Sequence, residues 1–120
     1  MAKILIVDDE ASICSEFAEL LEEDGHSIEC AESAAQALSK IKTIKFDLIF
    51  LDVLMPKVEG SEALIEMKKI CDTPVVIMSA YLAPEIEKQT LKAGAFTCLR
   101  KPFKLKEIKT IIEQAEKAKK

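Results

Sequence analysis

Short runs of branched apolar residues alternate along the chain with segments in which apolar residues recur at helical spacing. Five of these runs have the length and composition of β-strands. They cover residues 3–7, 27–31, 47–51, 74–79 and 97–100. The first, third and fourth runs are apolar almost throughout, which is typical of strands that are covered on both faces.

The segments between and after these runs predict five helices. In the first segment apolar residues recur at i, i+4, i+7 and i+8 from Ile13, and Gly25 is placed to end the helix. Pro84 and Gly94 mark the two ends of the fourth helix in the same way. The apolar markers of the others are Ala34, Leu38 and Ile41 for the second, Leu64, Met67 and Cys71 for the third, and Leu105, Ile108, Ile112 and Ala115 for the fifth.

This alternation predicts an α/β fold with a doubly wound (βα)₅ architecture. Strand–helix–strand connections between parallel neighbours are right-handed, so the helices should cover both faces of a five-stranded parallel sheet. The 120 residues leave no room for a second folded unit, and 49% apolar residues are enough to bury one core. We therefore expect a single domain.

Charge is distributed unevenly along the chain. The 17 basic and 21 acidic side chains give a net charge of −4, yet residues 4–39 contain ten acidic side chains and no lysine or arginine. We therefore expect one distinctly acidic face or edge. Because a negative chain is not attracted to nucleic-acid phosphates or anionic lipids, we expect no direct binding to nucleic acid and no binding to membranes.

The first residues and the cysteines argue against several other classes. The apolar run that directly precedes Asp8 has only four residues, too few for a secretory signal, and no apolar run reaches the length of a membrane span. A cytoplasmic protein is expected. Cys14, Cys30, Cys71 and Cys98 form no CxxC motif, and we expect them to be buried free thiols.

Charged and hydroxyl side chains occur where the predicted strands end. Asp8 and Asp9 follow the first strand, and Asp52 follows the apolar residues of the third. Ser79 ends the fourth strand, and Lys101 follows the fifth. Because parallel strands end at one edge of a sheet, where ligands of such folds bind, these five side chains should lie close together.

Taken singly, most of these residues have an ordinary structural explanation. Asp8 or Asp9 could cap the first helix, Ser79 could occupy a turn, and Lys101 could be a solvated surface lysine. Asp52 is different, because a carboxylate in apolar surroundings is costly to bury unless a partner compensates its charge. The coincidence of all five at one edge favours a functional site.

The chemistry of these groups is mutually consistent. Three neighbouring carboxylates repel one another and favour a bound cation, and oxygen ligands without imidazole or thiolate match a hard divalent ion, Mg²⁺ first. The lysine ammonium and the serine hydroxyl could bind the remaining oxygens of a phosphoryl group. A carboxylate could then attack phosphorus and form an aspartyl phosphate.

With these features the sequence resembles the receiver domain of two-component response regulators, of the chemotaxis-response-regulator type, over essentially its whole length. The motifs that carry the resemblance are Asp8-Asp9-Glu10, Asp52 within residues 47–56, Gly60, Met78-Ser79-Ala80, Gly94-Ala95 and Lys101-Pro102-Phe103. The resemblance implies that residues 1–120 form one receiver domain with the flavodoxin-like strand order 2-1-3-4-5.

The resemblance also implies roles for individual residues. Asp52 would accept a phosphoryl group from the phosphohistidine of a histidine kinase or histidine phosphotransfer protein, in a two-component system or phosphorelay. The groups that would bind Mg²⁺ are Asp8 through water, Asp9, Asp52 and the backbone carbonyl of Leu54. The residues that would bind the phosphate are Ser79, Ala80 and Lys101. The phosphorylated form would alter binding of a downstream effector protein, or of an output domain absent from this chain.

The sequence departs from the family pattern at the switch residue. Three residues before Lys101 the family usually has an aromatic side chain that moves on activation, and this chain has Cys98. Phe96 lies two residues earlier, and strand alternation predicts that it shares a sheet face with Cys98. The loop after Ser79 is a second route for coupling the site to the surface. The lysine–proline peptide of the family, here at Pro102, is commonly cis.

A second departure concerns the lifetime of the phosphorylated state. Leu54 and Tyr81 stand two residues past Asp52 and Ser79, where the family tunes hydrolysis. Neither side chain can orient an attacking water and both are bulky. We therefore expect a phosphoaspartate that hydrolyses slowly for its class.

Two other classes share parts of this pattern. A haloacid-dehalogenase-like, Mg²⁺-dependent phosphatase has a second Asp two residues after its nucleophile, where this chain has Leu54. A flavodoxin-like FMN-binding module needs a phosphate-binding loop after the first strand, where Asp8 and Asp9 would repel phosphate. A degenerate receiver that serves only as a scaffold is disfavoured, because all five site residues are present. We predict a signalling domain that catalyses only its own phosphotransfer and dephosphorylation.

Overall fold

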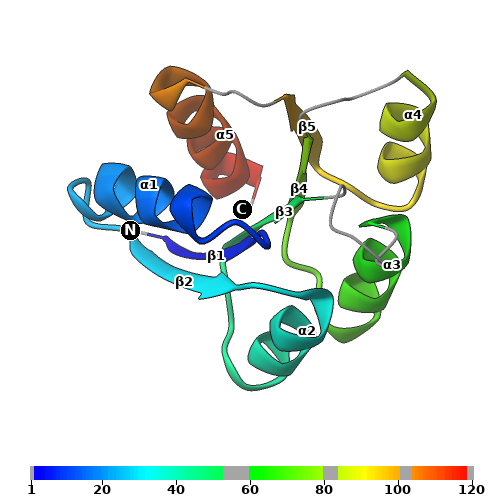
Figure 1. The fold of residues 1–120 in the computed structure, drawn as a ribbon. Helices are drawn as coiled ribbons and strands as arrows, with labels where there is room; N and C mark the ends of the chain where they lie inside the picture. The colour runs from blue at the N-terminus through cyan, green and yellow to red at the C-terminus, as the bar shows by residue number, and fades with distance from the viewer. Residues whose placement is uncertain (1, 53–59, 80–83, 101–103, 119–120) are drawn as a thin grey trace.

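Five parallel strands form a central sheet in the order β2-β1-β3-β4-β5, as expected (Figure 1). The computed structural model describes residues 2–52, 60–79, 84–100 and 104–118. The strands are β1 (Lys3–Val7), β2 (Ser27–Ala31), β3 (Leu48–Asp52), β4 (Val75–Ser79) and β5 (Thr97–Arg100). Strands β3 and β4 each begin one residue later than predicted, and β3 also ends one residue later. At the start of β3, the Asp47 carboxylate accepts a hydrogen bond from the Lys3 backbone N–H at 2.8 Å.

Helices follow the strands in the predicted alternation. They are α1 (Ala11–Glu22), α2 (Ala34–Thr43), α3 (Gly60–Ile70), α4 (Pro84–Lys92) and α5 (Leu105–Ala118). Gly25 and Gly94 lie just beyond α1 and α4 with φ of 89° and 112°, a conformation that side-chain-bearing residues rarely adopt. In the described ranges, no helix has both the length and the apolar character needed to cross a membrane.

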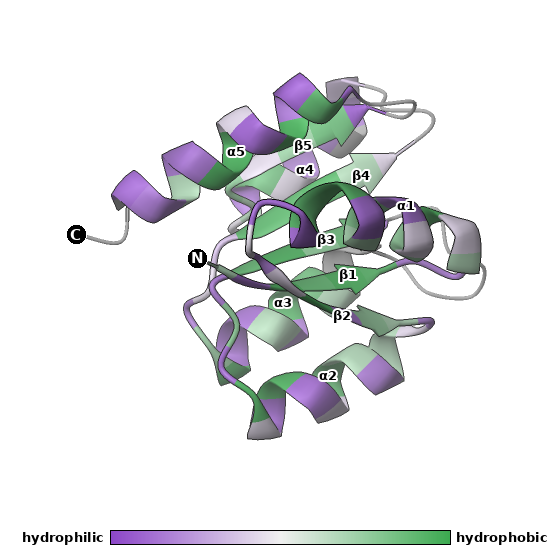
Figure 2. Ribbon diagram, turned by 90° about the vertical axis from the view of Figure 1, so that its left-hand side faces the viewer, coloured by the Kyte–Doolittle hydropathy of each residue, from purple (hydrophilic) through white to green (hydrophobic). Residues whose placement is uncertain are grey.

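The helices form one layer on each side of the sheet (Figure 1). Helices α1 and α5 cover one face, and α2, α3 and α4 lie on the other. Alternation along β3 sends Leu48 and Phe50 toward α1 and α5, and Ile49 and Leu51 toward the other layer. Both faces of the central strands are thus covered by helices. In Figure 2 these strands are almost uniformly hydrophobic, while α2 and α5 carry hydrophilic residues on their outer faces.

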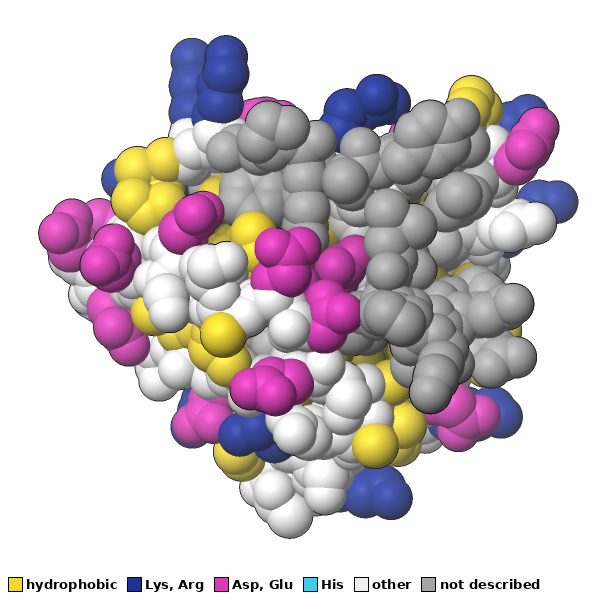
Figure 3. Space-filling model, in the orientation of Figure 1, with side chains coloured by type: hydrophobic (Ala, Val, Ile, Leu, Met, Phe, Trp, Pro, Cys, Tyr) yellow, Lys and Arg dark blue, Asp and Glu magenta, His cyan; other side chains and the backbone are white. Residues whose placement is uncertain are grey.

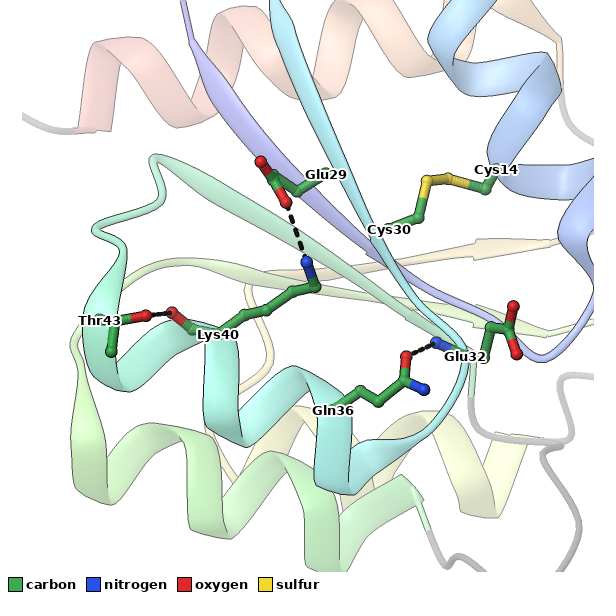
Figure 4. A network of polar contacts seen from close by, with 7 residues as sticks. All are labelled: Cys14, Glu29, Cys30, Glu32, Gln36, Lys40 and Thr43. Atoms are coloured by element: carbon green, nitrogen blue, oxygen red, sulfur yellow. Dashed lines mark hydrogen bonds and ion pairs between the residues drawn. A yellow bond between two sulfur atoms is a disulfide. The ribbon is translucent and has the colours of Figure 1, made fainter.

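The prediction of four buried free thiols is wrong for two of the cysteines. Cys14 on α1 and Cys30 on β2 form a disulfide (Figure 4). Helix α1 packs beside β2, so residues 16 apart in sequence have Cα atoms only 6.1 Å apart, within the usual range for a disulfide. Cys71 and Cys98 are free thiols, as predicted, but they are half-buried.

The predicted placement of Phe96 is also wrong. Phe96 packs against the core under α1 and α5, whereas Cys98 packs against the core on the opposite face. Strand β5 begins only at Thr97, so strict alternation does not extend to Phe96. The ring of Phe96 therefore does not replace, on the face where Cys98 lies, the aromatic side chain that the family usually has at position 98.

Candidate functional site

The register of the sheet brings the predicted acidic residues together at its carboxyl edge. Val7 of β1 lies opposite Leu51 of β3, so Asp8 and Asp52 are the next residues on neighbouring strands. One carboxylate oxygen from each of Asp8, Asp9 and Asp52 lies within 4.8 Å of the others. Figure 3 shows acidic side chains gathered near the middle of this face of the molecule. The structure thus assembles the acidic cluster that the sequence predicted, and we call these three residues the acidic cluster.

The three carboxylates differ in exposure. Asp8 and Asp52 are only 2% and 4% exposed, whereas Asp9 is exposed to solvent. The Asp8 carboxylate accepts a hydrogen bond from the Glu10 N–H at 2.9 Å. The backbone N–H of Asp8 in turn donates to the Ala31 carbonyl at the end of β2, at 3.0 Å. Asp8 is therefore held by two neighbouring segments, and Asp9 faces the solvent from which a ligand would arrive.

This arrangement fits a hard divalent cation. Two unit charges about 4 Å apart repel by about 4 kcal/mol at the effective dielectric constant of a protein surface. A bound divalent ion with oxygen ligands removes that repulsion, and the cluster offers three carboxylates without imidazole or thiolate. The donor set therefore matches Mg²⁺ better than Zn²⁺ or copper, which favour nitrogen and sulfur ligands.

Ser79 lies on the strand next to this cluster. It ends β4, directly after Met78, and Met78 is the register partner of Asp52. The serine side chain is fully buried, and Arg100 is its register partner on β5. The structure thus places a hydroxyl group at the same edge of the sheet as the buried carboxylates.

Comparison with known proteins identifies the family. A model of the response regulator receiver domain matches residues 4–113. The chain belongs to this family. The receiver domain is 37% identical over 109 residues to a CpxR homolog of Haemophilus influenzae, a transcriptional regulatory protein, and 35% identical over 114 residues to the regulatory protein AtoC of Escherichia coli. These matches cover 90% and 94% of this chain but 47% and 25% of the two relatives.

Solved structures agree with this assignment over nearly the whole chain. A two-component response regulator from Clostridium difficile superposes with a TM-score of 0.93 at 27% identity, covering 98% of this chain and 97% of its own. The receiver domain of the Francisella response regulator 1452 superposes with a TM-score of 0.90 at 31% identity, covering 100% of both chains. The expected fold and family are confirmed.

Several of the predicted site residues of this receiver domain lie outside the described residues. They are Leu54, Ala80, Tyr81, Lys101 and Pro102. Their predicted roles in metal binding, phosphate binding and switching stay predictions. Asp8, Asp9, Asp52 and Ser79 are described, and the structure brings them to one edge.

Cys98, where the sequence analysis expects the aromatic residue of the family, contacts α4. Its Sγ lies 3.7 Å from the hydroxyl oxygen of Thr90, which is buried. Burial raises the pKa of the Cys98 thiol, and the hydrogen bond with Thr90 opposes part of that rise. Cys98 is therefore a half-buried contact between β5 and α4.

The edge strand β2 carries an ion pair away from the acidic cluster. The Lys40 ammonium lies 2.9 Å from the Glu29 carboxylate, and this hydrogen bond lowers the pKa of Glu29 (Figure 4). Both side chains are about one-third exposed, so the pair is worth less than about 1 kcal/mol. It joins α2 to β2 and has no evident part in the site.

Proposed function

We propose that this receiver domain is a phosphorylatable switch in which Asp52 accepts a phosphoryl group from a phosphohistidine. The observation that carries the proposal is the acidic cluster, whose three carboxylate oxygens lie within 4.8 Å of one another at the carboxyl edge of the sheet. Membership of the receiver family supports a signalling role and disfavours the phosphatase and FMN-binding alternatives. The donor is a histidine kinase or a histidine phosphotransfer protein.

Mg²⁺ would be held by the acidic cluster and the Leu54 backbone carbonyl, with Asp8 acting through water. When bound there, the ion would supply positive charge that offsets the charge of the transferring phosphoryl group. Asp8 is fixed by its backbone hydrogen bonds, so it contributes a pre-positioned negative charge rather than a mobile one. The exposed Asp9 is the group best placed to exchange solvent for the ion.

Asp52 is the nucleophile. It is the last residue of a strand that is buried throughout, so its carboxylate has little freedom to leave the attack position. One carboxylate oxygen forms a bond to phosphorus as the bond from phosphorus to the histidine nitrogen breaks. Ser79, Ala80 and Lys101 would then bind the phosphate oxygens, with the lysine supplying positive charge.

The gain of negative charge at Asp52 would bias a surface that a partner recognises. We assign this coupling to Ser79 and to the Cys98–Thr90 contact between β5 and α4. The partner is a downstream effector protein or an output domain absent from this chain, and we place the domain in the cytoplasm. Leu54 and Tyr81 are expected to slow hydrolysis of the phosphoaspartate.

The test is mass spectrometry of the intact chain after incubation with acetyl phosphate and Mg²⁺. We expect the mass to increase by one phosphoryl group, and we expect the adduct to disappear after treatment with hydroxylamine, which cleaves acyl phosphates. The matched control contains a chelator instead of Mg²⁺ and should show no adduct. Absence of the adduct in both samples would overturn the proposal.

The exposed side of α1 supplies a surface for the kinase or phosphotransfer partner. Glu16, Glu19 and Glu23 are exposed on α1 or directly after its last residue. Charge complementarity then calls for a basic surface on the partner, because opposite charges raise the rate of encounter. The ion pair of Lys109 with Asp24, at 3.1 Å, fixes the end of this segment against α5.

Charge reversal tests this surface. With Glu16→Lys, Glu19→Lys and Glu23→Lys combined, we expect phosphotransfer from the kinase to slow by about tenfold or more at low salt. Phosphorylation by acetyl phosphate should not change. The matched control reverses Glu66, Glu87 and Glu113, which are exposed on α3, α4 and α5. Equal slowing by both triple variants, or a rate insensitive to salt, would contradict the assignment.

A further inference from the structure

The Cys14–Cys30 disulfide lies beside the acidic cluster rather than at a remote part of the fold. Cys14 is one turn after the start of α1, and Cys30 is the next-to-last residue of β2. Figure 4 shows the bridge joining the helix to the edge strand. The Cα separation of 6.1 Å is ordinary for a disulfide, so the fold itself brings the two sulfurs into bonding range.

Backbone hydrogen bonds connect each half of the bridge to Asp8. On the β2 side, the carbonyl of Ala31, the residue after Cys30, accepts the Asp8 N–H at 3.0 Å. On the α1 side, Glu10 donates its N–H to the Asp8 carboxylate and accepts the Ile13 N–H at 3.1 Å, one residue before Cys14. Asp8 therefore lies between the two segments that the disulfide joins.

A cavity of about 260 Å³ gives access to this pair. Asp8, Cys14, Cys30 and Glu32 are among the residues that line it, so the sulfurs and one residue of the acidic cluster share one cavity. Cys30 is exposed, whereas Cys14 is only 8% exposed. A small reagent can thus reach Cys30 first.

The first turn of α1 depends on the bridge more than the rest of the helix does. Ala11 and Ser12 are exposed, and Cys14 is the first buried residue of the helix. Phe17 and Leu21 are fully buried and hold the later turns on the sheet whether or not the bridge is present. Opening the disulfide should therefore loosen the turn that leads directly out of the acidic cluster.

We propose that Cys14 and Cys30 form a reversible thiol–disulfide site whose oxidised state holds Asp8 in place and tightens binding of Mg²⁺ by the acidic cluster. The coupling to Mg²⁺ rests on the proposed function. Pre-ordering of Asp8, which holds the ion through water, reduces the entropy lost when the ion binds, so the closed form has the higher affinity. In the cytoplasm thiols are kept reduced and disulfides are mostly transient or redox-sensing. The pair would therefore be reduced most of the time and form the disulfide transiently under oxidising conditions.

Closing the bridge needs a low-molecular-weight disulfide as oxidant. The Cys30 thiolate attacks one sulfur of that disulfide, which releases one small thiol and leaves a mixed disulfide on Cys30. The Cys14 thiolate then attacks the Cys30 sulfur and releases the second small thiol. Two cysteine thiols are oxidised, the small disulfide takes up the two electrons, and the two protons end on the released thiols. Two small thiols reverse the reaction.

The redox step is tested by equilibrating the protein in glutathione buffers of increasing oxidised-to-reduced ratio, alkylating free thiols and mapping peptides by mass spectrometry. As the ratio rises, we expect the fraction of protein with Cys14 and Cys30 cross-linked to increase in a single transition, while Cys71 and Cys98 are alkylated at every ratio. The Cys71→Ser/Cys98→Ser variant should keep the transition, and the Cys14→Ser/Cys30→Ser variant should lose it. A pair that stays open, or stays closed, at every ratio overturns the proposal.

The coupling is tested by calorimetric titration of Mg²⁺ into the fully oxidised and fully reduced protein. We expect the oxidised form to bind at least threefold more tightly, and the Cys14→Ser/Cys30→Ser variant to match the reduced form under both conditions. The Asp8 and Glu10 amide protons should also exchange more slowly in the oxidised form. Equal affinities overturn the coupling and leave the proposed function standing, whereas absence of Mg²⁺ binding in both forms overturns the two together.

Discussion

Asp52→Asn should abolish phosphorylation of this chain by acetyl phosphate and by a phosphohistidine donor. The amide has nearly the shape of the carboxylate, and residue 52 is only 4% exposed at the end of a buried strand, so the fold should be retained. A neutral amide oxygen, however, is a much weaker nucleophile toward phosphorus than a carboxylate. Intact-mass spectrometry with acetyl phosphate and Mg²⁺ measures the loss directly.

Asp72→Asn is the matched control for this variant. Asp72 is an exposed acid in the connection between α3 and β4, so the same chemical change occurs away from the carboxyl edge. This variant should acquire the phosphoryl group as the parent chain does. An undiminished adduct on the Asp52→Asn protein would show that another residue is the acceptor.

The same substitution should weaken the response of stability to Mg²⁺. A ligand that binds only the folded state at 100 times its Kd raises the free energy of unfolding by about 2.7 kcal/mol. Urea denaturation of the parent chain with and without Mg²⁺ should show an increase of this order at that saturation. At the same Mg²⁺ concentration the Asp52→Asn protein should show a clearly smaller increase, because one of its three carboxylates is gone.

The fold of this chain was predictable because local patterns and topology point the same way. The bounds of β1, β2 and β5 follow directly from their apolar runs. The exceptions are β3 and β4, which each begin one residue later than predicted. At β3 the cause is specific, since the hydrogen bond that Lys3 donates to the Asp47 side chain comes from a residue 44 positions away. Contacts of that kind determine where an element begins or ends, and a local sequence window does not contain them.

The acidic cluster was predictable for a related reason. Parallel strands in register end together, so Asp8 and Asp52 had to become neighbours once the order of the strands was correct. The disulfide was missed because a search for CxxC spacing detects only local pairs, while Cys14 and Cys30 meet through the packing of α1 on β2. Phe96 was misplaced because alternation was extended one residue beyond the start of β5.

Phe50→Ala should lower the free energy of unfolding by about 3–5 kcal/mol, the usual cost of removing a fully buried aromatic ring. Phe50 lies in the middle of β3 and is inaccessible to solvent. Its ring centroid is 5.0 Å from that of Phe17 on α1, in a tilted arrangement with an angle of 51° between the planes. Urea denaturation measures the change, and a loss below about 1 kcal/mol would contradict this account of the core.

Leu91→Ala is the matched surface control, because Leu91 is 44% exposed on α4. This substitution should lower the free energy of unfolding much less than removal of a buried ring.

The contact between the rings of Phe17 and Phe50 can be isolated by combining Phe50→Ala with Phe17→Ala. Aromatic pairs in this geometry contribute about 0.5–1.5 kcal/mol beyond their buried area. The loss of unfolding free energy in the double variant should therefore be smaller than the sum of the two single losses by that amount. Full additivity would mean that α1 is held on β3 by burial alone, without a specific contribution from the two rings.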